Sequence, residues 1–341
     1  MVVPEHCGKR TLAGTIDEIA SSSPHRVWAR YPTSPEAFEH GEFRQVTFAI
    51  LANAVNRLAW HLKTTLPDSR LGDSVAYIGP SDIRYFVLAC AASKCRLRAL
   101  FFSPRNNLES HLGLMEQTDC QVLLQPKEKP QDQAIGSILQ QRPMKTIDMP
   151  TIDQLLDKTA VDHFTFDIPW SDAVHQPFLT LHTSGSTGLP KPIDINHGLI
   201  STIDAQQMLA DVDGRSVTAR AWANRTVYTA LPPFHSAAIN FFTYSVFQST
   251  ELLFGPSNQP PSVRTVEQIL DTHVTSAGVM APSLLAEVSA EESVLQKMSR
   301  WSSVTFGGGP LPQQAGDSLW NGNTQKSFRF SDRRRHSTYQ S

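Results

Sequence analysis

Short apolar segments that alternate with helical patterns recur along most of the chain and constrain its fold more than any other feature. The segments typical of strands read SVAYIG, ALFFSP, CQVLLQP, FLTLHTS, KPIDIN, TVYTALP, ELLFGP, SAGVMAP and SVTFGGG. Helical patterns such as NNLESHLGLMEQT, TVEQILDTH and SLLAEVSAEESVLQKM separate several of them. Strands that alternate with helices favour parallel β-α units over sandwiches or barrels built from hairpins. The sequence therefore predicts an α/β fold with parallel β-α units.

Helices are also expected near the N-terminus. Residues 11–30 carry apolar side chains at helical spacing, and Pro24 ends that run. A second amphipathic helix is predicted from Thr47, the expected N-cap, to Lys63. A buried helix, IRYFVLACAASK, follows the strand segment SVAYIG. The first predicted strand thus stands between two helices in the sequence.

One domain is expected to fill most of the chain. It would span residues 11–319, after an N-terminal tail of residues 1–10. Within it, residues 126–150 are rich in Pro, Gln and Lys and are predicted to form an exposed connection. Residues 320–341 lack periodicity and contain few aliphatic side chains, so they are predicted to be a disordered tail. The run Arg333, Arg334 and Arg335 is too short to indicate nucleic-acid binding.

The composition is typical of a soluble globular protein. Of the 341 residues, 40% are hydrophobic and 18% are charged, which excludes a highly charged disordered chain and a membrane protein. The formal net charge of −2 provides no overall field that would attract nucleic acid or an anionic membrane. We therefore expect neither nucleic acid nor a membrane as a partner.

The cysteines and the N-terminus indicate a reducing compartment. The four cysteines, Cys7, Cys90, Cys95 and Cys120, form no C-x-x-C pair and are predicted to be buried free thiols. The first residues, MVVPEHCGKRTLAG, lack the apolar stretch of a secretory signal. The predicted location is the cytoplasm.

The most informative segment is the run TSGSTGLPK, residues 183–191, between two predicted strands. Glycines let backbone N–H groups converge on an oxyanion, hydroxyl groups add donors, and a lysine adds positive charge. The run is not a Walker A motif, because Pro190 separates Gly188 from Lys191 and no Ser or Thr follows the lysine. A flexible Ser/Gly linker is the alternative, but the flanking strands and the Pro-Lys ending favour a phosphate-binding loop.

Three segments together resemble the adenylate-forming (AMP-binding) superfamily, which includes acyl-CoA synthetases, luciferases and the adenylation domains of nonribosomal peptide synthetases. Residues 183–191 resemble its signature phosphate loop. Residues 231–236, LPPFHS, resemble its next motif, an aromatic residue and a histidine beside the carboxylate pocket. Residues 304–311, VTFGGGPL, resemble the strand and glycine turn that pack on the adenine. The three segments occur in the order found in the family.

Two further segments narrow the resemblance to fungal adenylate-forming reductases, which are nonribosomal-peptide-synthetase-like proteins with adenylation, carrier and reductase domains. These segments are YIGPSDIRY, residues 77–85, and SPRN, residues 103–106. The pair Lys191-Pro192 also fits that subgroup. The resemblance covers about residues 10–315, nearly the whole chain.

The resemblance implies that a carboxylate attacks the α-phosphate of ATP, giving an acyl-adenylate and pyrophosphate. A phosphopantetheine thiol on a carrier domain, either of another chain or of the missing C-terminal part, would then accept the acyl group. The implied phosphate-binding residues are Thr183, Ser184, Gly185, Ser186, Thr187, Gly188 and Lys191, with Thr187 also contacting Mg²⁺. Gly307, Gly308 and Gly309 would border the adenine, and Phe234 and His235 would line the carboxylate pocket.

Each of these residues also has a plainer interpretation. His235 could be an ordinary turn histidine, and the three glycines could form a simple tight turn. The segment Asp211–Gly214 has the start of a calcium loop but lacks the later ligands, so a solvated turn is expected there.

The end of the chain departs from the family pattern. Nothing between Pro312 and Ser341 matches the family's Tyr-Gly-x-Thr-Glu motif, its ribose-binding Asp or the lysine of its C-terminal lid. Carrier and reductase motifs are also missing from the sequence. These departures predict a truncated adenylation domain with impaired ligase activity, from secondary metabolism. The alternative is a catalytically inactive nucleotide- or acid-binding remnant that acts as a partner or regulator of an intact paralogue.

Overall fold

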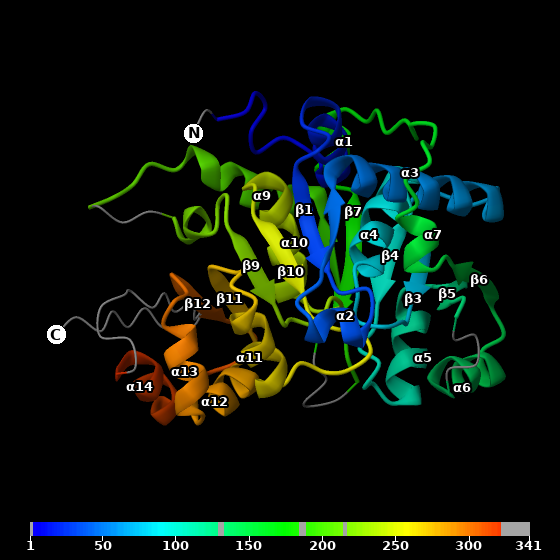
Figure 1. Cartoon of the computed structure of the whole chain (residues 1–341). Helices are drawn as coiled ribbons and strands as arrows, with labels where there is room; N and C mark the ends of the chain where they lie inside the picture. The colour runs from blue at the N-terminus through cyan, green and yellow to red at the C-terminus, as the bar shows by residue number, and fades with distance from the viewer. Residues whose placement is uncertain (1–2, 129–132, 184–188, 214–216, 322–341) are drawn as a thin grey trace. The chain divides into compact units, whose positions relative to one another are not determined.

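A computed structural model describes residues 3–128, 133–183, 189–213 and 217–321 (Figure 1). The chain forms two compact units, each assembled from segments that are distant in the sequence. The first unit comprises residues 1–26, 46–209 and 233–247, and the second comprises residues 27–45, 210–232 and 248–341. The sequence pattern predicts one continuous domain instead. Because both units are discontinuous, no change of composition along the chain marks the boundary between them.

The sheet of the first unit has six strands in the order β6-β5-β3-β4-β7-β8 (Figure 1). Neighbouring strands are parallel except for the edge strand β8, which is antiparallel to β7. The strands are β3 (Ser74–Tyr77), β4 (Arg98–Phe101), β5 (Val122–Pro126), β6 (Lys145–Met149), β7 (Pro177–His182) and β8 (Pro192–Asn196). Parallel pairing places the carboxyl ends of β3, β4 and β7 at the same edge.

The helices of the first unit are α1 (Leu12–Ser22), α3 (Phe48–Thr65), α4 (Arg84–Lys94), α5 (Leu108–Gln117), α6 (Gln133–Gln141), α7 (Ile152–Leu155), α8 (Trp170–Ala173), α9 (His197–Ala205) and α10 (Ser236–Phe247), with a 3₁₀ turn at Gln206–Met208. Thr47 is the N-cap of α3, as predicted, and its Oγ1 accepts a hydrogen bond from the Ile50 N–H at 3.4 Å. Helix α4 is buried along its whole length because it contacts β4, β7, α1 and α3.

The second unit has a six-stranded sheet in the order β12-β11-β9-β10-β1-β2. Its strands are β1 (Val27–Tyr31), β2 (Arg44–Thr47), β9 (Thr226–Thr229), β10 (Glu251–Phe254), β11 (Ala277–Met280) and β12 (Ser303–Phe306). The helices are α2 (Pro35–Glu39), α11 (Val263–Asp271), α12 (Pro282–Ser289), α13 (Glu292–Met298) and α14 (Gln313–Asn321), with a 3₁₀ turn at Thr218–Ala221. All nine strand segments predicted from the sequence are strands, and the α/β fold with parallel β-α units is confirmed.

Some predicted elements differ from the structure. The helix predicted over residues 11–30 ends at Ser22, and the five-residue strand β1 begins at Val27, after Pro24. The helical pattern did not predict this strand. The long helix expected over residues 283–298 is divided into α12 and α13. Residues 126–150 contain α6 and β6 rather than only an exposed connection. The helix α6 was not predicted because most residues of this segment are polar. Two of its residues, Ile135 and Ile138, are nevertheless buried in the core of the first unit.

The ends of the predicted domain also differ. Helix α14 follows the glycine turn, where the sequence showed no family motif, and it crosses the predicted boundary at residue 320. The rest of the tail that was predicted to be disordered, residues 322–341, lies outside the described residues.

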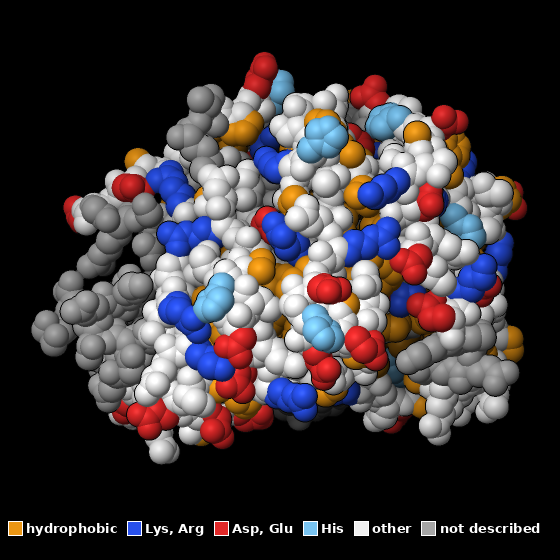
Figure 2. Space-filling model, viewed as in Figure 1, with side chains coloured by type: hydrophobic (Ala, Val, Ile, Leu, Met, Phe, Trp, Pro, Cys, Tyr) orange, Lys and Arg blue, Asp and Glu red, His pale blue; other side chains and the backbone are white. Residues whose placement is uncertain are grey.

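The surface carries both signs of charge. Figure 2 shows Lys and Arg side chains interspersed with Asp and Glu over the face in view, as the small net charge leads one to expect. In the part of the chain that the structure describes, no helix has the length and apolarity needed to cross a membrane. All four cysteines are free thiols; Cys90 and Cys120 are buried, whereas Cys7 and Cys95 are partly exposed.

Candidate functional site

The predicted phosphate loop, residues 183–191, connects the carboxyl end of β7 to the edge strand β8. Strand β7 pairs in parallel with β4, and Thr180 lies opposite Leu100. The loop therefore begins beside the carboxyl end of β4. In open α/β sheets, ligands bind at the carboxyl ends of the strands.

Hydrogen bonds join the two ends of this loop. The Thr183 N–H donates to the Lys191 carbonyl at 3.1 Å, and the Lys191 N–H donates to Thr183 Oγ1 at 3.0 Å. The predicted phosphate-binding residues between them, Ser184, Gly185, Ser186, Thr187 and Gly188, lie outside the described residues. The same applies to the Mg²⁺ contact predicted for Thr187.

Lys191 is positioned to bind an anion. Its side chain is exposed, and its ammonium group has no hydrogen-bond or ion-pair partner among the described residues. An unpaired cation next to a closed Ser/Gly loop fits a polyphosphate ligand. Within the described residues, no group of three or more His, Cys, Asp or Glu side chains is arranged to hold a metal ion.

His182, the last residue of β7, is a functional candidate to which the sequence analysis assigned no role. Its Nδ1 lies 2.7 Å from the Thr183 carbonyl oxygen. Its Nε2 accepts a hydrogen bond from the Ser103 N–H at 3.2 Å and lies 3.3 Å from Asn106 Nδ2. Ser103 and Asn106 belong to the SPRN segment that follows β4. Their contact with His182 spans 79 residues of sequence, so no local pattern could reveal it.

Phe234 and His235, predicted to line a carboxylate pocket, immediately precede α10. The Phe234 side chain is buried, and its ring centroid lies 5.9 Å from that of Tyr85 and 4.8 Å from that of His235. His235 is exposed as a residue, but neighbouring atoms shield part of its ring. This desolvation lowers the pKa of His235, and the positive charge of nearby Arg105 lowers it further. The structure thus brings His235 and the SPRN segment close to the start of the phosphate loop.

Tyr85 anchors the aromatic side of this region. Its hydroxyl donates to the Gly79 carbonyl at 3.1 Å and accepts from the Gly79 N–H at 3.2 Å. The ring is fully buried and lies edge-on to both Tyr77 and Phe101. Burial raises the pKa of Tyr85, so its hydroxyl stays protonated at neutral pH. These contacts hold the ring against Phe234.

A buried ion pair lies beyond β3 in the same unit. The Arg84 guanidinium donates to both carboxylate oxygens of Asp82, at 3.1 Å from Nε and 2.8 Å from Nη2, and to Glu128 at 2.5 Å. Burial raises the pKa of Asp82, and its hydrogen bonds with Arg84 oppose that rise. The segment YIGPSDIRY that supported the family resemblance therefore supplies a packed structural core, with Tyr77, Asp82, Arg84 and Tyr85 all buried.

The glycine turn lies in the second unit, directly after β12. Gly308 has φ +99°, a backbone conformation that other residues rarely adopt. A Cβ atom placed on Gly307 or Gly308 would meet no atom within 4 Å, and one on Gly309 would meet only Pro282 Cγ, at 4.0 Å. The surface above the turn is therefore open and could accept a flat ring. The same geometry suits an unoccupied tight turn.

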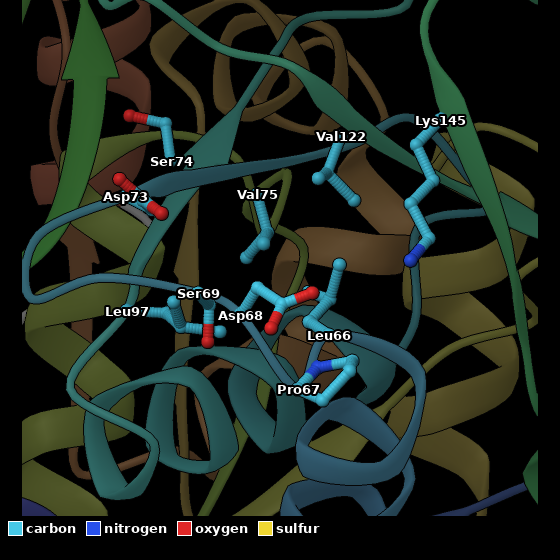
Figure 3. Close-up of a pocket in the computed structure, with 10 residues that line it drawn as sticks. All are labelled: Leu66, Pro67, Asp68, Ser69, Asp73, Ser74, Val75, Leu97, Val122 and Lys145. Carbon is cyan, nitrogen blue, oxygen red and sulfur yellow. The ribbon is translucent and has the colours of Figure 1, made fainter.

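One cavity in the first unit lies at the opposite edge of the sheet (Figure 3). It has a volume of about 190 Å³ and is lined in part by Ser74, Val122 and Lys145, the first residues of β3, β5 and β6. The Lys145 ammonium donates to the Thr65 carbonyl at 2.5 Å. This cavity shares no residue with the predicted site and lies at the amino ends of the strands.

Comparison with known proteins places these features in a family context. Residues 24–327 match the family model described as AMP-binding enzyme. The chain is 33% identical over 317 residues to the isocyanide synthase-NRPS hybrid crmA of Aspergillus fumigatus, covering 91% of this chain and 20% of that protein. It is 30% identical over 322 residues to a carboxylic acid reductase of Neurospora crassa, covering 93% of this chain and 30% of that protein.

The fold has a counterpart among solved structures. The structure of the luciferase-like enzyme from Zophobas morio superposes with a TM-score of 0.72 at 12% identity, covering 96% of this chain and 72% of that one. At this identity the similarity shows the fold alone. The chain spans between a fifth and a third of the length of the two curated relatives.

Proposed function

Because the chain belongs to the AMP-binding enzyme family, we propose that it activates a carboxylic acid with ATP. A carboxylate oxygen would attack the α-phosphorus of ATP, the bond between that phosphorus and the bridging oxygen to the β-phosphate would break, and pyrophosphate would leave. The products are an acyl-adenylate and pyrophosphate. Two anions must meet in this reaction, so the protein has to neutralise charge and fix their orientation.

The observation that carries the proposal is the hydrogen-bonded pair of loop ends, with a lysine ammonium group that has no partner among the residues that the structure describes. The mutual bonds of Thr183 and Lys191 hold the loop ends together at the carboxyl edge of the sheet. Lys191 would bind the β- and γ-phosphates, and Thr183 would present its hydroxyl beside them. Residues Ser184 to Gly188 would add backbone N–H groups and hydroxyls, with Thr187 contacting Mg²⁺. Bound with ATP, Mg²⁺ supplies further neutralisation of the triphosphate charge.

The carboxylic acid would bind next to His235 and Phe234. A lowered pKa keeps the His235 imidazole neutral at neutral pH, so it can donate a hydrogen bond without drawing a proton from the acid. Arg105 adds a positive charge that attracts the carboxylate. In the second unit, Gly307, Gly308 and Gly309 would border the adenine ring.

The later steps are proposed from the names of the relatives. One relative is a hybrid that includes a nonribosomal peptide synthetase, and another is a carboxylic acid reductase. We propose that, in secondary metabolism, the phosphopantetheine thiol of a carrier domain attacks the acyl carbon of the adenylate, so that a thioester forms, the bond from the acyl carbon to the AMP oxygen breaks and AMP leaves. The carrier would be on another chain or in the longer protein that such relatives represent.

The test is carboxylate-dependent exchange of labelled pyrophosphate into ATP, with purified protein, magnesium and a panel of aryl and aliphatic acids. We expect exchange that requires an acid, and a loss of about 10²-fold in Lys191→Ala, the size of effect typical when one charge-stabilising group is removed. Lys158→Ala is the matched control, because Lys158 is also exposed and lies outside the site. Its exchange should equal that of the unchanged protein.

The opposite result has a defined meaning. If folded protein shows no exchange with any acid but still binds ATP, the chain is a nucleotide-binding module rather than an acid-activating enzyme. Equal exchange in Lys191→Ala and Lys158→Ala would show that the loop does not bind the phosphates.

A further inference from the structure

We propose that His182 is a positioning residue that holds the phosphate loop against the SPRN segment and so sets the affinity for ATP. The inference deepens the function proposed above and rests on it. The contacts that carry it form the His182 cluster, defined as Ser103, Asn106, His182, Thr183 and Lys191.

The partners of His182 fix its tautomer. A backbone N–H can only donate, so Nε2, which accepts from the Ser103 N–H at 3.2 Å, carries no proton. A carbonyl oxygen can only accept, so Nδ1 carries the proton that it donates to the Thr183 oxygen at 2.7 Å. Asn106 Nδ2, 3.3 Å from Nε2, adds a second donor to the same acceptor. A single neutral imidazole therefore bonds to two segments at once.

The hydrogen bonds continue from His182 to the far end of the loop. Thr183, whose carbonyl accepts from His182, also donates its N–H to the Lys191 carbonyl and accepts from the Lys191 N–H through Oγ1. The opposite strand does not replace this link, because the Lys191 N–H, which faces Thr183 in the β7–β8 register, donates to Thr183 Oγ1 and not to the Thr183 carbonyl. Among the described residues, the imidazole thus connects the loop ends to the segment that follows β4, in addition to the pairing of β4 with β7.

The sheet register brings the two segments to the same level. Leu100 of β4 lies opposite Thr180 of β7. Ser103 lies three residues after Leu100, and Thr183 lies three residues after Thr180, so the two residues are at corresponding positions of the two neighbouring segments. Beyond this point the SPRN segment turns sharply, with the Asn106 N–H donating to the Ser103 carbonyl at 3.1 Å and the Arg105 N–H to Ser103 Oγ at 3.3 Å. This turn presents the Ser103 N–H to His182 in a fixed direction.

Loss of the imidazole would act on the nucleotide through the loop. Without it, the Ser103 N–H and the Thr183 carbonyl lose their partners, and the loop ends gain freedom to move away from β4. A looser loop must be ordered when ATP binds, so the affinity for ATP should fall. The groups that meet the acid, His235 and Phe234, lie on another segment and keep their places.

The experiment uses three substitutions of His182 that separate the effects of its individual hydrogen bonds. His182→Phe keeps a ring and removes all three hydrogen bonds of the imidazole. His182→Gln can place an oxygen near the Nε2 position, to accept from Ser103, and His182→Asn can place an N–H near the Nδ1 position, to donate to Thr183. Hydrogen–deuterium exchange reports the protection of the Ser103, Thr183 and Lys191 amides, and the exchange assay reports KM for ATP, KM for the acid and kcat. His25→Phe, at an exposed histidine in the same unit, is the control.

In His182→Phe we expect faster deuteration at all three amides and an ATP KM raised about tenfold, the factor that the loss of one or two hydrogen bonds produces. The acid KM and kcat should change less than about twofold. His182→Gln should restore protection at Ser103 only, and His182→Asn at Thr183 and Lys191 only. If the phenylalanine variant does not fold, this split between the two amide variants still decides the question.

Two results would overturn the proposal. Unchanged deuteration in folded His182→Phe would show that the imidazole does not hold the loop. Faster deuteration with an unchanged ATP KM would show a structural role without an effect on the nucleotide. Failure of the proposed function is a separate outcome. The unchanged protein would then show no pyrophosphate exchange, but hydrogen–deuterium exchange would still show whether His182 holds the loop ends.

Discussion

At the scale of single residues, buried titratable groups make this protein sensitive to pH. His197, at the start of α9, lies between the rings of Phe166 and Phe178 and near the Ser93 hydroxyl, 3.1 Å from Nε2. It is only 2% exposed, and burial lowers its pKa to about 4. The folded state thus disfavours the charged imidazole, which the unfolded chain accepts at the ordinary value near 6.5.

This difference predicts acid destabilisation. Between the two pKa values the unfolded state binds more protons, so the free energy of unfolding falls as the pH drops from about 6.5 towards 4, by about 3 kcal/mol from this group. Urea denaturation at pH 7 and at pH 4.5 should show a smaller loss in His197→Gln than in the unchanged protein. The exposed His25→Gln should behave like the unchanged protein. Parallel losses in all three proteins would contradict the assignment.

At the scale of elements, β11 depends on a glycine. A Cβ on Gly278 would lie 2.1 Å from Trp301 Cζ3, and the Trp301 ring cannot move freely because it is buried and its Nε1–H donates to Thr275 Oγ1 at 3.0 Å. Gly278→Ala should therefore lower the free energy of unfolding by about 1–3 kcal/mol. Gly136→Ala in α6 is the control, since no atom lies within 4 Å of its Cβ and alanine favours the helix. Equal stability of both variants in urea would show that β11 can shift to admit the methyl group.

At the scale of the whole molecule, the chain passes repeatedly between its two units. A break in the exposed segment Leu209–Asp213 would leave α10 of the first unit on the C-terminal fragment and residues 27–45 of the second unit on the N-terminal one. We expect protein nicked there by a protease to elute as one species on a native sizing column. The two fragments should separate only in denaturant. Separation under native conditions would contradict this interdependence of the units.

Local sequence determined the elements and the nature of the loop. Three features depend only on neighbouring residues: the strand segments, the N-cap at Thr47 and the Ser/Gly run before Lys191. They can be predicted from the sequence because strand alternation, capping and glycine content act over a few positions. The helix and strand within residues 126–150 were harder to predict, because Ile135 and Ile138 are few among many polar residues.

Only the tertiary structure decided which distant residues meet. The bond between His182 and Ser103, the contact of Trp301 with Gly278 and the packing of Phe234 on Tyr85 depend on strand order and register. The division into two discontinuous units depends on them as well. Strand order results from the burial of apolar surface summed over the whole sheet, and no short stretch of sequence contains that sum. The sequence by itself therefore predicted a phosphate-binding loop, and the fold added His182, the residue that we propose holds its ends.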